Sequence, residues 1–256
     1  MRRVEAPPSG ASLPWRRWAV WAVSAGLAGY AVWVWLVSDA LDVIRVGPRP
    51  SAGHPVVVFL HGHGAAGDDL EPLAESLSKS LPETTFLLPE GPHSVALAGR
   101  SWIPSFEAPS RAEYVARLDQ EVAHTREQLW RVVESARSRG VSCSDITIAG
   151  FSLGARMAVE VALLAPLDCA LGGLIVLSGV DNKEHPLPSG GGAAFPALVA
   201  HGTQDEVVPL RDGVAIKEHL ERAGHPVTWL SFNGPHTIAP EVEAAVLAFL
   251  RGPRTR

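Results

Sequence analysis

The chain has 256 residues, 46% of them hydrophobic, and carries a formal net charge of −5 at pH 7. Its length fits one domain of about 200 residues with an N-terminal appendage, which is enough for a sizeable hydrophobic core. Without the first 37 residues, which hold four Arg and one Glu, the net charge falls to −8. This acidic balance argues against a nucleic acid or an anionic membrane surface as the partner.

The N-terminal region divides into three segments. Residues 18–37 carry no charge and would be about 30 Å long as a helix, enough to cross a bilayer. The preceding residues 1–17 hold four Arg and are expected in the cytoplasm, which places the rest of the chain on the extracytoplasmic side. We expect a linker over residues 38–52 and a folded domain over residues 53–256.

A cleaved signal peptide is the alternative for this region. Ser38-Asp39-Ala40 has small residues at the spacing of a cleavage site, and cleavage there would give a secreted protein. The uncharged segment is twenty residues long, whereas the apolar core of a signal peptide usually has about seven to fifteen. We therefore favour an uncleaved membrane anchor.

The first strand expected in the domain, residues 55–60, leads into the glycine-rich loop His61-Gly62-His63-Gly64. Glycine lets the chain turn back so that backbone N–H groups can point at a developing negative charge. A metal site on the two histidines is disfavoured, because the glycines make this segment a loop and no carboxylate or cysteine cluster accompanies it. Asp68 and Asp69 are expected to cap a helix over residues 70–77.

A second expected strand, residues 84–88, precedes the apolar loop Ser101–Phe106. Two aromatic residues of this loop, Trp102 and Phe106, either line a substrate pocket or pack as ordinary loop aromatics. A helix is expected over residues 112–139, where hydrophobic residues recur at spacings of three, four and seven.

The segment after this helix carries the most informative motif. A strand over residues 145–150 runs into Gly150-Phe151-Ser152-Leu153-Gly154, a G-x-S-x-G turn, and a helix is expected over residues 153–164. A serine hydroxyl is a poor nucleophile unless a tight strand-to-helix turn holds it clear of its neighbours and beside a base. Ser152 is therefore the candidate nucleophile.

Two cysteines each lie just before an expected strand. Cys143 precedes the strand that leads to the serine, and Cys169 precedes the next one, residues 172–177. If these strands are parallel neighbours, both cysteines lie at one edge of the sheet, where a disulfide is geometrically possible and suits an oxidising exterior. Two unrelated core cysteines are the alternative. Residues 181–194, rich in Pro and Gly, are expected to form a flexible loop near the site.

The candidate acid and base follow the last two strands. The strand at residues 197–200 leads to Asp205, and the strand at residues 227–232 leads to His236. Together with Ser152 they stand in the order Ser, Asp, His, each at the carboxyl end of a strand. In such a triad the histidine takes the serine proton, and the carboxylate orients the imidazole and stabilises its charged form.

Two backbone N–H groups are the expected donors of an oxyanion hole. They belong to His63, in the glycine-rich loop, and to Leu153, the residue after the nucleophile. If His236 is not the base, His201 is the next candidate.

Strands and helices alternate along the domain, with further helices expected over residues 214–223 and from Pro240 onward. Most strands are continuous hydrophobic runs, as expected of parallel strands covered on both faces. We therefore expect an α/β fold with a doubly wound, mostly parallel sheet whose site lies at the carboxyl edge of the strands.

Five motifs in this order resemble the phospholipase/carboxylesterase family of α/β-hydrolases, which includes acyl-protein thioesterases and small bacterial carboxylesterases. The likeness covers about residues 53–251, and its motifs are Leu60–Gly64, Gly99–Trp102, Gly150–Gly154, His201–Asp205 and Pro235-His236. The resemblance implies an α/β-hydrolase fold, hydrolysis of carboxylic esters or thioesters, and no cofactor. It also implies the triad and oxyanion positions assigned above.

This chain departs from the family pattern at two positions beside the nucleophile. Many members carry Gln after the serine and a second Gly after the motif, where this chain has Leu153 and Ala155. A backbone donor tolerates a change of side chain, so we expect activity to be retained and the acyl pocket to differ.

The sequence thus predicts a serine hydrolase of carboxylic esters, with lipophilic or acyl esters as substrates and the membrane as partner through the N-terminal helix. Lysophospholipase, thioesterase and acyltransferase activities are alternatives that use the same chemistry. A hydrolase fold used only as a binding module is the alternative of another class. The complete order of Ser, Asp and His argues against it.

Overall fold

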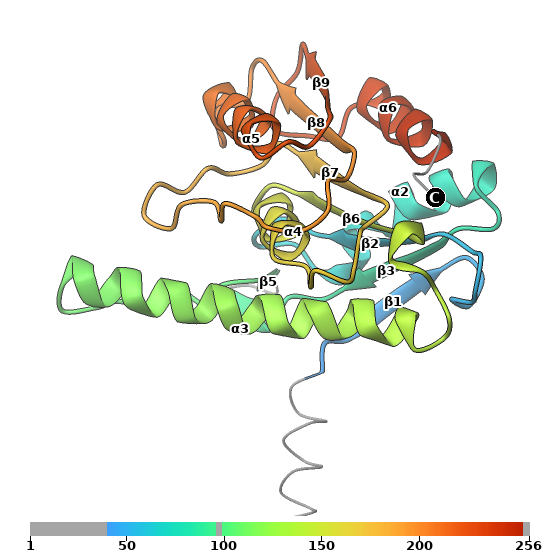
Figure 1. Ribbon diagram of the computed structural model, residues 1–256. Helices are drawn as coiled ribbons and strands as arrows, with labels where there is room; N and C mark the ends of the chain where they lie inside the picture. The colour runs from blue at the N-terminus through green and yellow to red at the C-terminus, as the bar shows by residue number, and fades with distance from the viewer. Residues whose placement is uncertain (1–39, 96–98, 253–256) are drawn as a thin grey trace, which may run out of the picture. The chain divides into compact units, whose positions relative to one another are not determined.

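The computed structural model describes residues 40–95 and 99–252, which are built around a seven-stranded sheet (Figure 1). The strand order is β1-β3-β2-β6-β7-β8-β9, and every neighbouring pair is parallel except β1 with β3. The strands are β1 (Val43–Val46), β2 (Val56–Leu60), β3 (Thr85–Pro89), β6 (Ile146–Phe151), β7 (Gly173–Leu177), β8 (Ala197–Gly202) and β9 (Val227–Phe232). The expected α/β fold with a mostly parallel sheet is confirmed.

Helices cover both faces of this sheet. They are the 3-10 helices η1 (Gly67–Leu70) and η2 (Cys143–Asp145), and the α-helices α2 (Glu71–Ser80), α3 (Arg111–Arg137), α4 (Leu153–Leu163), α5 (Leu210–Arg222) and α6 (Pro240–Arg251). One hydrophobic core joins the sheet to α3, α4 and α5, and a second joins its other face to α2 and α6. This cover explains why the strands are continuous hydrophobic runs.

Strand β2 shows how the two cores fix the site. Val56, Val58 and Leu60 belong to the core under α3, α4 and α5, whereas Val57 and Phe59 belong to the core under α2 and α6. All five are at most 1% exposed, and burial of each side chain contributes about 1.5–3 kcal/mol. Because side chains alternate along a strand, β2 is held from both faces, and the loop that follows it starts from a fixed point.

The N-terminal boundary of the folded unit differs from the expectation. Strand β1 lies within residues 38–52, which we expected to be a linker, and the unit begins at Leu41 rather than at residue 53. β1 pairs antiparallel with β3 at one edge of the sheet. The expected anchor, residues 18–37, lies outside the described residues. Within the described ranges, no helix has both the length and the hydrophobicity needed to cross a bilayer.

Two local features also differ. Asp68 and Asp69 lie inside η1, and neither serves as a cap, because the N-cap residues of η1 and α2 are Ala66 and Leu70. A short antiparallel hairpin, β4 (His93–Val95) and β5 (Gly99–Ser101), occurs where no strand was expected. Its three-residue strands are too short to leave a periodic pattern in the sequence.

A disulfide joins Cys143 and Cys169, whose Cα atoms are 5.3 Å apart. Cys143 begins η2, directly before β6, and Cys169 precedes β7, the parallel neighbour of β6. The two cysteines therefore lie at the amino edge of the sheet, opposite the edge where the expected site residues gather. Closing a loop with a sequence separation of 26 stabilises the folded chain by about 3 kcal/mol.

Candidate active site

Ser152 occupies a sharp turn between β6 and α4. Its φ of 57° lies in a region that residues with a side chain rarely adopt, at a cost of about 1–3 kcal/mol. The glycines on either side leave no room for a Cβ, which on Gly150 would lie 2.3 Å from Gly154 O and on Gly154 2.3 Å from Leu60 O. This close packing holds strand and helix in the turn that presents the hydroxyl at the carboxyl edge of the sheet.

Both expected oxyanion donors belong to segments that adjoin Ser152. A Cβ on Gly62 would lie 3.4 Å from Ser152 Cβ, so the glycine-rich loop passes directly beside the serine, and His63 is the next residue. Leu153 is the first residue of α4, where a backbone N–H has no partner within the helix. The positive end of the α4 dipole also favours negative charge at this point.

His61 fixes the glycine-rich loop. The Gly91 N–H donates to His61 Nε2 at 3.0 Å, so Nδ1 carries the proton and donates to Gly62 O at 2.7 Å. The Trp102 indole N–H donates to His61 O at 2.7 Å. Burial lowers the pKa of His61, which favours its neutral form. In the described part of the chain, no group of three or more His, Cys, Asp or Glu side chains is placed to hold a metal ion.

Trp102 packs as a core aromatic. Its side chain is fully buried, its ring lies 4.7 Å from the His61 ring, and the Thr125 hydroxyl on α3 donates to its carbonyl at 2.7 Å. Phe106 is half-buried and packs 5.0 Å from the Tyr114 ring, beneath the Arg117 guanidinium. The structure thus places Phe106 against the start of α3.

Asp205 and His236 form a tight pair. His236 Nδ1 lies 2.6 Å from Asp205 Oδ2, while Oδ1 accepts from the N–H groups of Val207 at 3.0 Å and Val208 at 2.8 Å. Burial raises the pKa of Asp205, but the hydrogen bonds from His236, Val208 and Val207 outweigh it, so the pKa is lowered. The carboxylate therefore stays ionised and can hold the imidazole with its proton on Nδ1.

The loop of His236 also lies near Ser152. The His236 ring packs against the ring of Phe151, the residue before the serine, with centroids 4.6 Å apart. Among the described residues, however, no hydrogen bond joins the Ser152 hydroxyl to His236 Nε2. Such catalytic hydrogen bonds are often long in a free enzyme and tighten when the substrate binds.

The alternative base, His201, is placed elsewhere. Its side chain is fully buried, Nε2 lies 2.9 Å from Val208 O and 3.5 Å from Asp205 Oδ2, and a Cβ on Gly213 would lie 2.4 Å from Nδ1. A ring enclosed between Asp205 and α5 cannot reach a substrate. His201 instead supports the loop that carries the acid.

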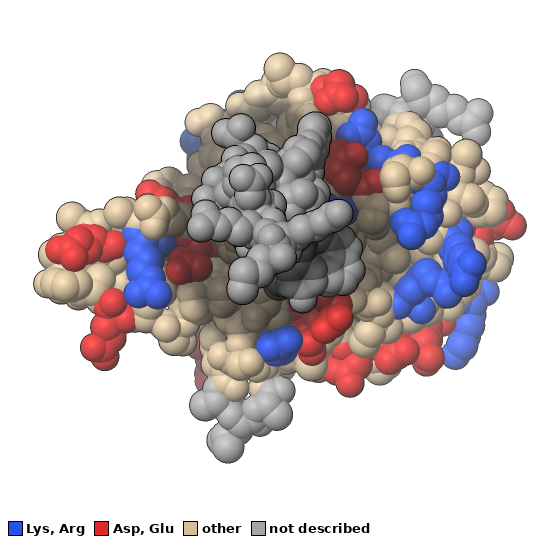
Figure 2. Space-filling view, turned by 90° about the horizontal axis from the view of Figure 1, so that it is seen from below, with Lys and Arg blue, Asp and Glu red and all other residues tan. Residues whose placement is uncertain are grey.

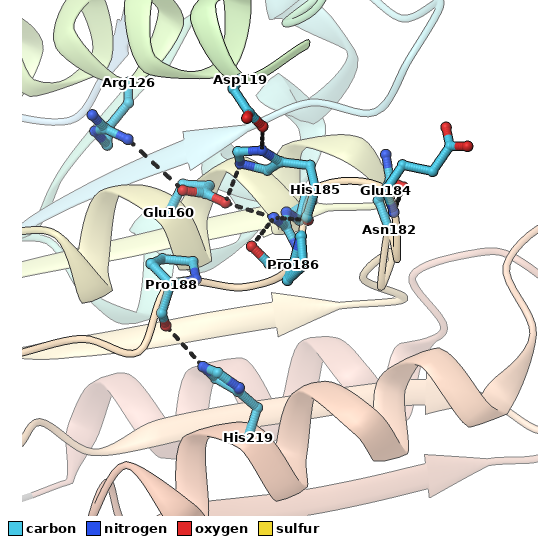
Figure 3. A network of polar contacts seen from close by, with 10 residues as sticks. Asp119, Arg126, Glu160, Asn182, Glu184, His185, Pro186, Pro188 and His219 are labelled. Carbon is cyan, nitrogen blue, oxygen red and sulfur yellow. Dashed lines mark hydrogen bonds and ion pairs between the residues drawn. The ribbon is translucent and has the colours of Figure 1, made fainter. Parts of the chain in front are cut away.

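A segment after β7, residues 181–194, which we call the strap, has no regular structure. Its backbone is held by two helices: Asp181 N–H donates to Asp212 on α5, Arg156 on α4 donates to the carbonyls of His185 and Pro186, and His219 on α5 donates to the carbonyl of Pro188. Figure 3 shows the contact between His219 and Pro188.

Five charged or titratable side chains join the strap to α3 and α4 and form what we call the clasp: Asp119, Arg126, Arg156, Glu160 and His185. His185 lies between two carboxylates, with Nδ1 2.5 Å from Asp119 and Nε2 3.1 Å from Glu160 (Figure 3). Glu160 is 1% exposed, and its carboxylate also forms ion pairs with the guanidinium groups of Arg156, at 2.6 Å, and Arg126, at 3.9 Å. Sequence analysis missed this network, because its members come from α3, α4 and the strap.

A pocket of about 390 Å³ opens beside His236, on the side of η1, α2 and α6. The residues that line it include Phe151, His236, Leu73, Ile238 and Glu243. Sequence analysis did not foresee it, because its walls come from four separate parts of the chain.

The surface of the molecule mixes charges on the face seen in Figure 2, where Lys and Arg side chains lie interspersed with Asp and Glu. Nucleic-acid binding commonly uses a continuous basic surface. The visible part of this face carries no continuous basic surface.

Comparisons with known proteins agree with this geometry. A family model described as Phospholipase/Carboxylesterase matches residues 42–252. An acyl-protein thioesterase 1 of Gibberella zeae is 26% identical over 223 residues, covering 80% of this chain and 93% of that protein. The same-named protein of Saccharomyces cerevisiae is 27% identical over 201 residues, covering 71% and 83%.

Solved structures give the same result. Esterase PE8 is 27% identical, with a TM-score of 0.69 and coverage of 83% of this chain and 98% of that chain. A phospholipase/carboxylesterase from Dyadobacter fermentans is 25% identical, with a TM-score of 0.67 and coverage of 82% and 96%.

Proposed function

The chain belongs to the phospholipase/carboxylesterase family and is an esterase-type hydrolase, and we propose that it cleaves carboxylic esters through an acyl-enzyme on Ser152. One observation carries the proposal. The Ser152 turn and the 2.6 Å pair of Asp205 with His236 occur together at the carboxyl edge of one sheet. A serine in such a turn beside a carboxylate-oriented imidazole is the arrangement that nucleophilic acyl transfer needs.

In the proposed reaction, His236 acts as the base. With the Nδ1 proton donated to Asp205, Nε2 is free to accept the proton of Ser152 as the hydroxyl attacks the ester carbonyl. The N–H groups of His63 and Leu153 then stabilise the oxyanion. His236 returns the proton to the leaving alcohol, and water repeats the sequence on the acyl-enzyme to release the acid and free Ser152.

Thioester cleavage is the second candidate. It is supported as well as ester cleavage is, because the curated relatives reported above are named acyl-protein thioesterases. The same triad serves both reactions, since only the leaving atom changes from oxygen to sulfur. A panel of esters and thioesters with one acyl group would decide between them by the ratio of kcat/KM.

Labelling by a fluorophosphonate probe tests the proposed nucleophile. Wild-type protein is expected to react at one site, and Ser152→Ala is expected not to react. Ser105→Ala is a matched control, because Ser105 is an exposed serine in the loop after β5. Folded wild-type protein that fails to label would favour a binding module over an enzyme.

We also propose that residues 18–37 anchor the protein in a membrane, with the catalytic domain on the extracytoplasmic side. The uncharged segment and the four Arg before it support this orientation. The disulfide between Cys143 and Cys169 supports an oxidising compartment. The full-length chain is expected to stay with membranes after carbonate extraction and to be digested by external protease in intact spheroplasts. Release as a shortened soluble protein would instead indicate signal cleavage.

A further inference from the structure

The pocket described above is lined by His236, the residue that protonates the leaving group in the proposed reaction. In acyl transfer the bond between the acyl carbon and Ser152 Oγ forms first and gives a tetrahedral oxyanion, and the bond to the leaving oxygen breaks when this intermediate collapses. That oxygen takes the proton that His236 has just removed from the serine. The leaving group therefore has to pass beside the imidazole, and His236 itself lines this pocket.

The pocket combines an apolar floor with an aromatic wall. Leu73 from α2 and Ile238 from the loop before α6 supply aliphatic surface, and Phe151 presents its ring beside the His236 ring. An aromatic face of this kind attracts a cation placed over it, with most advantage when water is excluded.

Two acidic residues complete the lining, the exposed Asp69 from η1 and Glu243 from α6. Glu243 is half-buried, and the Ser76 hydroxyl on α2 donates to its Oε1 at 2.5 Å, so its carboxylate is held in place. None of the residues that line the described pocket is Lys or Arg. Negative charge on the pocket wall is therefore not neutralised from within the pocket.

We propose that this pocket binds the leaving group of the ester and favours one that carries an alkylammonium group. The proposal rests on the proposed function, because it needs Ser152 and His236 to act as described above. The aliphatic side chains receive the carbon chain of the leaving group, while Phe151, Asp69 and Glu243 receive its positive charge. Selectivity arises from the charge of the leaving group and not from its shape.

Two esters with one acyl group and isosteric alcohols test the proposal. The choline ester carries a trimethylammonium group, and the 3,3-dimethylbutyl ester replaces its nitrogen with carbon. We expect the full-length wild-type protein to show a kcat/KM about five- to tenfold higher for the choline ester, a ratio typical of a few partly exposed charge and cation–π contacts. The ratio is expected to shrink as the salt concentration rises.

Charge-neutral variants locate the source of this ratio. Asp69→Asn combined with Glu243→Gln is expected to bring the ratio of kcat/KM values to about one. The rate on the choline ester falls, because the pocket has lost its two carboxylates. Glu241→Gln is the matched control, because Glu241 lies on the first turn of the same helix but does not line the pocket. It is expected to keep the wild-type ratio.

The outcomes separate this inference from the proposed function. Equal rates on the two esters in wild-type protein, or a preference that survives in the Asp69→Asn/Glu243→Gln variant, would overturn the leaving-group site while ester hydrolysis stands. Absence of hydrolysis of either ester and of p-nitrophenyl esters, or full activity in Ser152→Ala, would overturn the proposed function and this inference with it.

Discussion

His236 and His185 both face carboxylates, but they do so in different surroundings. His236 has one carboxylate, Asp205, 2.6 Å from Nδ1, and its Nε2 makes no hydrogen bond within the described part of the chain. His185 has a carboxylate at each nitrogen, Asp119 at 2.5 Å and Glu160 at 3.1 Å. An imidazole can donate from both nitrogens only when it is protonated.

This comparison separates the histidine proposed as the base from a structural one. A single carboxylate orients His236 and leaves the other nitrogen able to accept a proton, as a base requires. Two carboxylates hold His185 in its charged form, and neither nitrogen is free for chemistry. The two histidines thus differ in the number of carboxylates that contact them, and not in how close these carboxylates lie.

The largest effect is expected on turnover when the His236 pair is altered. Removal of the base in His236→Ala should lower kcat by about five orders of magnitude, and Asp205→Asn by about four, because the wrong tautomer of His236 is then favoured. Steady-state hydrolysis of a p-nitrophenyl ester measures both effects.

The control for this experiment comes from the clasp. His185→Ala should keep kcat within about threefold of wild type, because His185 takes no part in proton transfer. Near-normal hydrolysis by His236→Ala would show that another residue is the base.

The second largest effect is expected on the free energy of unfolding when the clasp is altered. Arg156 and Glu160 are both at most 2% exposed and lie 2.6 Å apart, so Glu160→Ala leaves a buried guanidinium without its carboxylate. We expect the free energy of unfolding to fall by about 3–5 kcal/mol, measured by guanidinium denaturation of the full-length chain.

A double variant sharpens this test. Arg156→Met combined with Glu160→Leu removes both charges, and its loss should be smaller than that of Glu160→Ala, because no uncompensated charge remains on this helix face. A double variant less stable than Glu160→Ala would contradict the account of the clasp as a charge network.

The placement of the three proposed catalytic residues at one sheet edge was predictable from the sequence, and the clasp was not. Ser152, Asp205 and His236 each follow a hydrophobic strand, and parallel strands bring their carboxyl ends to one edge, so local patterns sufficed to place them. His185 and Asp119 are 66 residues apart, on a strap and a helix whose own patterns carry no sign of each other.

The same reason explains the other differences. Strand β1 has only four residues and is interrupted by Arg45, so its half-exposed pattern resembles a linker. Trp102 follows a short hairpin and reads as a loop aromatic, but α3 covers it and supplies the Thr125 hydrogen bond. When a helix far along the chain buries a residue such as Trp102, the sequence around that residue does not indicate the burial.

The two regions should also lose stability at opposite ends of the pH range. The hydrogen bond to Glu160 raises the pKa of His185 above its ordinary 6.5, against burial and Arg156, and Asp119 raises it further. Because the folded pKa exceeds the unfolded one, this stabilisation is complete below pH 6.5 and is lost as the pH rises through the folded pKa. Asp205 has a lowered pKa, so its contribution is lost as the pH falls below its ordinary 3.8.

His185→Gln tests the alkaline side of this prediction. The difference in unfolding free energy between wild type and His185→Gln should be largest below pH 6.5 and shrink as the pH rises through the folded pKa of His185, because the wild-type imidazolium is then lost. The charged groups around this imidazole are Asp119 and Glu160, which contact it, and Arg126 and Arg156, which contact Glu160. A difference that stays constant with pH would mean that packing, and not protonation, is what His185 supplies.

The smallest effect is expected at the outer end of the strap. Arg111 on α3 lies 3.3 Å from Glu184, but their side chains are 80% and 37% exposed, so water and salt screen the pair. Arg111→Ala or Glu184→Ala should change the free energy of unfolding by no more than about 0.5 kcal/mol, by the same denaturation measurement. A loss comparable to that of Glu160→Ala would contradict the distinction drawn here, because it would mean that exposed contacts hold the strap as firmly as the buried clasp does.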